Sequence, residues 1–167
     1  MGWVLLIYRV PREPSTPRIA IWRRFRALGV AQLADGTVAL PEDARTREHL
    51  EWVADQVLDA GGTALLLRAQ AFTVKDERAV AHAMAGARAE EYQEVIASAA
   101  QARDVSDDAE RRRVVARLRK QLRVIQRRDY FPPPDRDGAV AAVADLARAT
   151  TAEQPPASTE QTWRSQS

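Results

Sequence analysis

The sequence contains no cysteine and only two histidines, His49 and His82. Without cysteine the chain can form no disulfide, no thiolate metal site and no cysteine nucleophile. A reducing compartment is the simplest setting for such a chain, so we expect a cytoplasmic protein. Each histidine stands alone on a predicted helix, whereas a metal site needs several converging ligands. We therefore expect neither a metal nor a cofactor.

Long apolar runs and catalytic motifs are missing as well. The apolar run at residues 3–10 is too short to span a bilayer and lacks the leading basic region of a secretion signal, so no membrane partner is expected. The chain has no glycine-rich phosphate loop and no Gly-x-Ser-x-Gly motif. Its acidic pairs, Glu90-Glu91 and Asp107-Asp108, are adjacent in sequence and diverge by about 100° on a helix. These absences predict a protein that is not an enzyme.

Acidic residues are absent from one segment, residues 111–128, which carries nine basic side chains. Because the whole chain has a formal net charge of only +2, the rest of the chain is negative. Eight of the nine basic residues are arginines, whose forked guanidinium suits bidentate contact with phosphate. Three explanations are open: a nucleic acid, an acidic surface on this chain or on a partner, or simple solvation. The lack of interspersed acid favours nucleic acid.

Turn and cap residues divide the first 73 residues into six elements. Thr16 is a good N-cap, Pro17 a good first helical residue and Gly29 a good helix stop. Asp35-Gly36 is a favoured hairpin turn. The expected elements are strand 3–10, helix 17–28, a hairpin of two strands within 30–40, helix 41–62 and strand 63–72. With right-handed crossovers this β-α-β-β-α-β order predicts a ferredoxin-like fold of the α+β class.

The second half of the sequence has helical periodicity. Helices are expected over 76–103, over about 107–128 for the basic segment, and over 139–149. Within the basic helix, Val115, Leu118, Leu122 and Ile125 are spaced 3-4-3, which indicates a buried seam, either inside the chain or between the subunits of a homodimer. From about Thr150 the sequence is polar and proline-rich. The predicted organisation is therefore a ferredoxin-like domain at 1–73, a helical region at 74–149 and a disordered tail at 150–167.

Several stretches resemble a known family. WVLLIYRVPREPSTPRIAIWRRFRALG, DGTVALPEDARTREHLEWVADQV, GGTALLLRAQ and RLRKQLRVIQRRDYFPPP are similar to the N-terminal domain of ChrB, the regulatory protein of bacterial chromate-resistance operons. The resemblance covers about residues 3–148. It implies a DNA-binding transcription regulator of a chromate efflux operon. Family members also carry a C-terminal domain linked to the chromate response, so a separate sensor domain is an expected partner here.

A second resemblance concerns the element order, which is similar to that of the small CRISPR-associated endonucleases. Those enzymes have an aspartate at the end of the first strand. The matching stretch here, residues 8–12, is Tyr-Arg-Val-Pro-Arg and contains no carboxylate. A divergent metal-dependent nuclease therefore stays the weaker alternative. The other alternative is an interaction module whose basic helix binds an acidic partner.

The candidate site is a set of basic residues that would contact the phosphates of double-stranded DNA. Arg9 and Arg12 could add to it, whereas Trp22 and Trp52 are expected to pack inside the protein. The set comprises Arg18, Arg23, Arg24 and Arg26 on the first helix, and Arg112, Arg113, Arg117, Arg119, Lys120, Arg123, Arg127 and Arg128 on the late helix.

Overall fold

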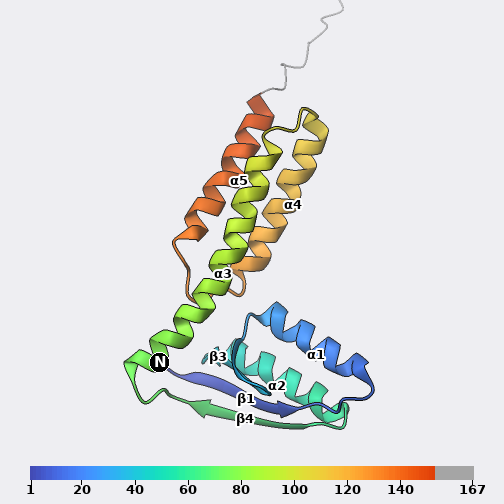
Figure 1. Cartoon of the computed structure of the whole chain (residues 1–167), viewed down its shortest axis with the longest axis vertical. Helices are drawn as coiled ribbons and strands as arrows, with labels where there is room; N and C mark the ends of the chain where they lie inside the picture. Colours follow the sequence, from blue (N-terminus) through green and yellow to red (C-terminus); the bar gives the residue numbers. More distant parts are fainter. Residues whose placement is uncertain (153–167) are drawn as a thin grey trace, which may run out of the picture.

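A computed structural model describes residues 1–152 of the chain. Its sheet and two helices form one end of the molecule, and three longer helices rise from that end (Figure 1). The elements are β1 (Trp3–Arg9), α1 (Ser15–Leu28), β2 (Ala31–Ala34), β3 (Thr37–Pro41), α2 (Ala44–Asp59), β4 (Thr63–Ala69), α3 (Val74–Ala102), α4 (Asp108–Gln126) and α5 (Asp135–Ala152). The expected mixture of helices and strands is confirmed.

The four strands form one antiparallel sheet in the order β2-β3-β1-β4. β1 is central, and its Leu6 lies opposite both Val38 of β3 and Leu66 of β4. Leu6 and Val38 are fully buried in a core shared with α1 and α2, which both lie above the sheet in Figure 1. The opposite face is open, because Ile7, Leu65 and Leu67 are exposed.

The start of α1 differs from the sequence prediction. The helix begins at Ser15, and Pro14 occupies the N-cap position in an extended conformation with no side-chain cap. Thr16 was therefore wrong as the N-cap, since the restricted backbone of Pro14 lets the helix start earlier. Gly29 ends the helix as predicted, in a left-handed conformation with φ of 68°.

The hairpin turn forms where the sequence predicts it, and side chains cap the next two helices. Gly36 has the positive φ of 71° that the Asp35-Gly36 turn requires. Asp43 and Thr46 form a capping box at the start of α2, and Thr46 also donates a hydrogen bond to the carbonyl of Pro41. The side chain of Thr73 accepts a hydrogen bond from the amide of Asp76 and caps α3.

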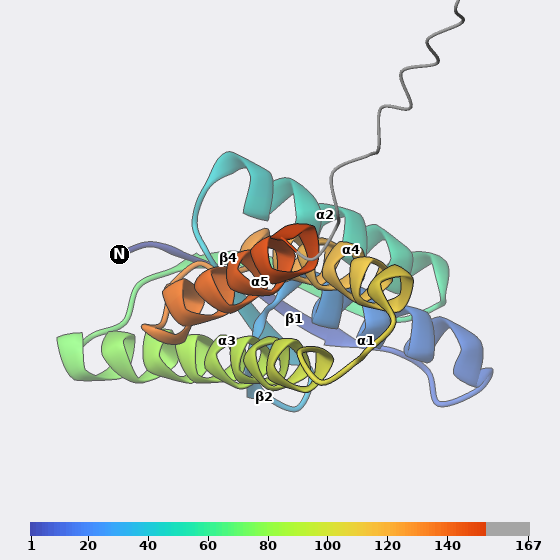
Figure 2. The same cartoon turned by 90° about the horizontal axis from the view of Figure 1, so that it is seen from above.

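The helix α3 belongs to two hydrophobic cores. Its Met84 is buried in the core of the sheet and Val80 packs against that core, whereas Tyr92, Val95 and Ala99 belong to a second core with α4 and α5. Seen from above, α3 runs along one side of the sheet, and α4 and α5 lie over the strands (Figure 2). The residues of the sheet's core therefore extend beyond residue 73.

The last helix is longer than expected, because α5 begins at Asp135 and reaches Ala152. Its acidic first turn suits the positive end of the helix dipole. Thr150, predicted to start a disordered tail, is buried inside α5 and donates a hydrogen bond to the carbonyl of Leu146. The remainder of that predicted tail, residues 153–167, lies outside the described residues.

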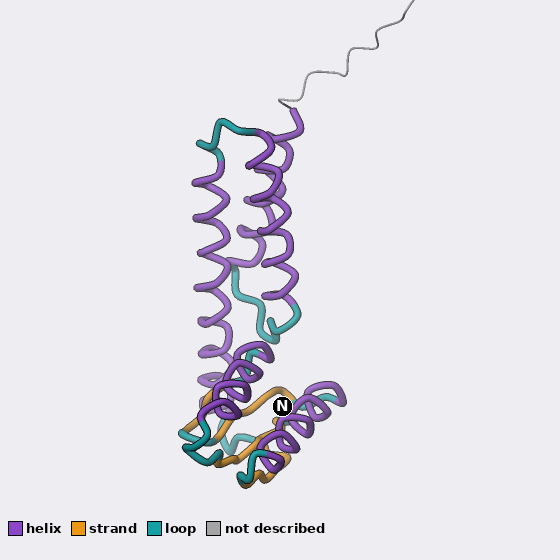
Figure 3. Tube along the Cα trace, turned by 90° about the vertical axis from the view of Figure 1, so that its right-hand side faces the viewer, coloured by secondary structure: helices purple, strands orange, loops and turns teal. Residues whose placement is uncertain are grey.

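The segment after α4 joins the helices to the sheet end. The rings of Phe131 and Trp3 lie 6.0 Å apart between centroids, and the hydroxyl of Tyr130 donates a 3.2 Å hydrogen bond to the carbonyl of Leu28. Viewed from the side, the three long helices pack side by side and extend away from the sheet end; we call them the column of helices (Figure 3).

Candidate nucleic-acid interface

The outer face of α4 carries most of the predicted DNA-contacting residues. Seven basic side chains of α4 are exposed. At about 100° per residue, they lie within an arc of roughly 160° around the helix axis. We call this set the α4 basic face. It comprises Arg112, Arg113, Arg117, Arg119, Lys120, Arg123 and Arg127.

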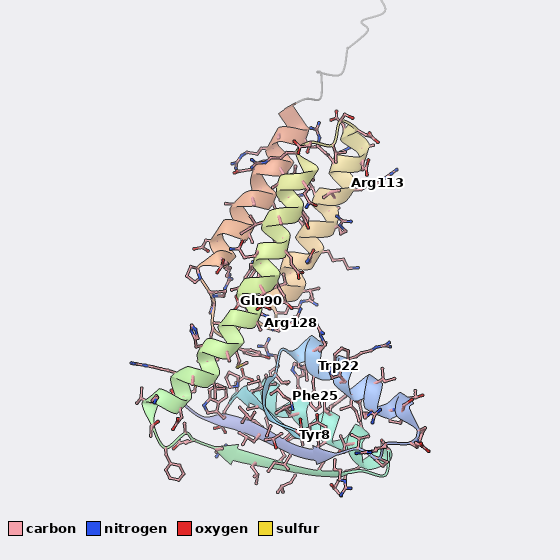
Figure 4. The ribbon with its side chains drawn as sticks, in the orientation of Figure 1. Tyr8, Trp22, Phe25, Glu90, Arg113 and Arg128 are labelled. Atoms are coloured by element: carbon pink, nitrogen blue, oxygen red, sulfur yellow. The ribbon has the colours of Figure 1, made fainter. Side chains whose placement is uncertain are left out.

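None of the seven residues forms an ion pair with any side chain among residues 1–152. The acidic residues of α4 are confined to its first turn, where Asp108 pairs with the buried Arg111. Arg113 projects away from the bundle in Figure 4. The positive charge of the face is therefore directed outward and not neutralised within the described chain.

The opposite face of α4 explains why the arginines point outward. Val115, Leu118, Leu122 and Ile125 are all buried in the core shared with α3 and α5. The 3-4-3 seam is thus an intramolecular contact, which decides between the two alternatives that the sequence left open. Because this seam fixes the rotation of α4, the polar side chains are held on the outer side.

The basic residues of α1 are also exposed, namely Arg18, Arg23, Arg24 and Arg26. Arg23 and Arg24 line an open groove of about 680 Å³ between α1 and α2, which also contains Asp59. In Figure 1 the helix α1 extends to the right, below α4. The side chain of Arg113 on α4 points to the same side in Figure 4. The basic residues of α1 and those of α4 therefore lie on the same side of the molecule, where the column of helices meets the sheet end.

Arg128, the last predicted contact, is occupied within the chain. Its guanidinium forms a 2.9 Å ion pair with Glu91 and donates a 2.9 Å hydrogen bond to the carbonyl of Arg26. Figure 4 shows Arg128 at the base of the helices, above Trp22 on α1. We leave Arg128 out of the α4 basic face. Arg9 and Arg12 are both exposed.

The prediction that Trp22 and Trp52 pack inside the protein is wrong. Their exposed fractions are 55% and 60%. The buried face of α1 is formed by Ile21, Phe25 and Leu28, so Trp22 falls one position outside it. The guanidinium of Arg26 lies 5.1 Å from the centroid of the Trp22 ring, a cation–π contact on the surface.

Sequence reasoning missed Arg88, the second arginine at the base of the helices. It is buried, and its Nε lies 2.9 Å from Oε2 of Glu91. Burial lowers the pKa of Arg88 below its ordinary value, while the carboxylate of Glu91 acts in the opposite direction. The only signal in the sequence was the i, i+3 spacing of these two residues on α3.

Metal and membrane sites find no support in the residues described. Nowhere in residues 1–152 do three or more histidine, aspartate or glutamate side chains gather in a way that could hold a metal ion. Over the same residues, no helix combines the length and apolarity needed to cross a membrane. At the end of β1, where the nucleases have a carboxylate, the ring of Tyr8 packs against Phe25 with centroids 4.9 Å apart.

Comparison with known proteins gives one family and one fold relative. Residues 18–154 match the family model described as Protein ChrB, N-terminal. Protein ChrB of Cupriavidus metallidurans is 32% identical over 134 residues, which are 78% of this chain but only 41% of that protein. The chain therefore spans less than half the length of this relative.

The uncharacterized protein Rv0674 from Mycobacterium tuberculosis is similar in structure, with a TM-score of 0.52 at 17% identity. The match covers 90% of this chain and 61% of that one, and it concerns the fold alone. The family model and the 32% identity together show that the chain belongs to the ChrB N-terminal domain family.

Proposed function

We propose that this protein is a cytoplasmic DNA-binding regulator of transcription, acting on a chromate-resistance or related stress-response operon. Membership of the ChrB family supports the chromate-resistance part of the proposal. The observation that carries the DNA-binding part is the α4 basic face, with seven exposed cations and no acidic partner in the described chain. Such a face matches the evenly spaced phosphates of a duplex.

Other helices of the same chain show that this face is unusual. On α2 the exposed Arg47 pairs with Glu51, and on α5 the exposed Arg148 pairs with Asp145. A helix that needs only solubility carries both signs of charge in this way. The like charges along α4 cost some stability, and a nucleic acid that binds there would offset that cost.

The arrangement of helices supports a two-sided contact with DNA. We propose that α4 lies along the phosphates of one strand and that Arg23 and Arg24 reach a neighbouring stretch of backbone. The strand order β2-β3-β1-β4, with α1 and α2 on one face, supports the ferredoxin-like assignment for this part. A second copy or a sensor domain would have to bind another surface, because the seam of α4 is already buried.

The test is to remove two charges from the centre of the face. We expect the double variant Arg119→Ala, Arg123→Ala to bind the protein's own promoter DNA more weakly and to lower the salt slope of binding by about 2, one for each lost phosphate contact. The matched control is Arg47→Ala, Arg148→Ala, which removes the same charge from α2 and α5. Equal effects of the two double variants would contradict a specific role for α4.

An interaction module for an acidic protein is the second candidate, because the same uncompensated face would suit it. Under that function the Arg119→Ala, Arg123→Ala variant would lose the acidic partner while its weak DNA binding stayed as in the parent chain. The two candidates thus differ in which ligand the variant loses.

A further inference from the structure

A cavity of about 280 Å³ lies where α1, β2 and the base of the helices meet. Three arginines and one glutamate line it, so its charge is clearly positive. Trp22, Phe25, Gly29 and Val30 form part of the wall. The charged residues are Arg26 from α1, Arg88 and Glu91 from α3, and Arg128 from the segment after α4.

Glu91 uses both carboxylate oxygens on two of these arginines. Its Oε2 lies 2.9 Å from Nε of Arg88, and its Oε1 accepts a 2.9 Å hydrogen bond from Nη2 of Arg128. One carboxylate therefore holds two guanidinium groups side by side. A pair of like charges kept this close at a partly buried position favours a further anion.

Several N–H groups at the cavity have no acceptor among the described residues. Nε of Arg128 is buried without a hydrogen-bond partner. Nη1 of Arg88 has no acceptor and lies close to the backbone of Gly29, where an added Cβ would be only 2.7 Å away. The guanidinium of Arg26 lies 5.1 Å from the centroid of the Trp22 ring and has neither a hydrogen bond nor an ion pair within residues 1–152. The donors thus come from three different segments of the chain.

Asp129 also acts on Arg88, since its negative charge raises the pKa of Arg88, but its hydrogen bond and ion pair are made to other residues. Its Oδ2 accepts a 2.8 Å hydrogen bond from the hydroxyl of Tyr92 and lies 3.8 Å from Nη1 of Arg136. Asp129 is therefore engaged on the side of the second core. With Asp129 and Arg136 included, positive charge still exceeds negative by two.

We propose that this cavity binds a tetrahedral oxyanion, either free in solution or as a phosphate of bound DNA. Guanidinium groups on several sides of the cavity can donate charge-assisted hydrogen bonds to the several oxygens of such an anion. Residues of α1, of α3 and of the segment after α4 line the cavity, so a bound anion contacts both the sheet end and the long helices. The cavity is tested first on the protein without DNA, so the outcome of that test does not depend on whether the α4 basic face binds DNA.

The test is a calorimetric titration of the DNA-free, full-length protein with sulfate, at constant ionic strength maintained with chloride. We expect saturable binding of one sulfate and a change in tryptophan fluorescence that the Trp22→Phe variant lacks. Thermal stabilisation is not a suitable readout, because sulfate stabilises most proteins by exclusion from their surfaces.

Arg26→Gln is the decisive variant, because Arg26 is exposed and forms no ion pair that the fold needs. Loss of its charge-assisted hydrogen bonds should weaken sulfate binding roughly 10- to 100-fold. Arg88→Gln should do the same, with circular dichroism to confirm that it folds. Arg148→Gln on α5 removes the same charge elsewhere and should leave sulfate binding unchanged.

Three results would overturn the proposal: no saturable binding, equal binding by Arg26→Gln, or a loss in Arg119→Gln that assigns the sulfate to α4. A repeat with saturating duplex then identifies the source of the anion. Unchanged sulfate binding indicates a free oxyanion, whereas sulfate excluded by DNA indicates that a backbone phosphate occupies the cavity.

Discussion

Tyr92 and Asp129 form a buried polar contact between α3 and the segment after α4. The hydroxyl of Tyr92 donates a 2.8 Å hydrogen bond to Oδ2 of Asp129, and Tyr92 is fully buried. Burial, followed by the bond to Asp129, raises the pKa of Tyr92 well above its ordinary value of 10.0. The tyrosine therefore remains a donor throughout the neutral pH range.

We expect Tyr92→Phe to lower the free energy of unfolding by about 1–3 kcal/mol, because it leaves a buried carboxylate short of a donor. Since the folded-state pKa of Tyr92 is raised, its contribution is complete below pH 10 and declines as unfolded chains ionise above that pH. Urea unfolding at pH 7 and at higher pH measures both effects.

Tyr130→Phe is the matched control for this prediction. Its hydroxyl donates a longer, 3.2 Å bond to a neutral carbonyl, that of Leu28, so its loss should cost less, about 0.5–1.5 kcal/mol. Equal costs for the two variants would show that Asp129 does not depend on Tyr92.

Among elements, α4 has the clearest division between a buried and an exposed face. Leu118 is almost fully buried at the centre of its seam. We expect Leu118→Ala to destabilise the fold by about 2–5 kcal/mol through the cavity it leaves, which corresponds to a fall in Tm of several degrees or more. The fall should not depend on protein concentration, because the seam is intramolecular.

Thermal unfolding over a hundredfold range of protein concentration checks this expectation. A midpoint that rises with concentration in the parent chain would indicate that the seam is shared between subunits. Arg117→Ala, on the exposed side of the same helix, provides the control and should change stability little.

Sequence predictions were correct where a feature depends on a few neighbouring residues. Gly29, Asp35-Gly36 and the seam of α4 were read correctly, because each depends on backbone conformation or period within a few residues. Trp22 was misplaced, and the ion pair of Arg128 with Glu91 was not predicted. Their surroundings depend on how the helices dock on the sheet end, which no short stretch of sequence specifies.

The start of α1 shows a smaller failure of the same kind. Thr16 and Pro14 are both acceptable at a helix start, and the sequence alone does not choose between them. For the candidate site, the exposed cations of α4 were predictable from one helical period. The cavity formed by Arg26, Arg88 and Arg128 was not, because its members come from two helices and from the segment after α4.

At the scale of the whole molecule, charge and shape act together. The α4 basic face is exposed, and its Arg113 points away from the column of helices on the side toward which α1 extends (Figure 4). A long, rigid ligand with regularly spaced negative charge could contact both surfaces at once. A small acidic patch on another protein would engage fewer of these side chains.

The most direct test of this account is the salt dependence of binding to the promoter of the protein's own operon, with a scrambled duplex measured in parallel. The account predicts tighter binding to the promoter and a slope of about −4 to −6 in log K against log salt, from phosphate contacts by most of the α4 basic face. Equal binding to both duplexes would contradict a specific regulator. No binding even at low salt would show that these cations serve a protein partner instead of DNA.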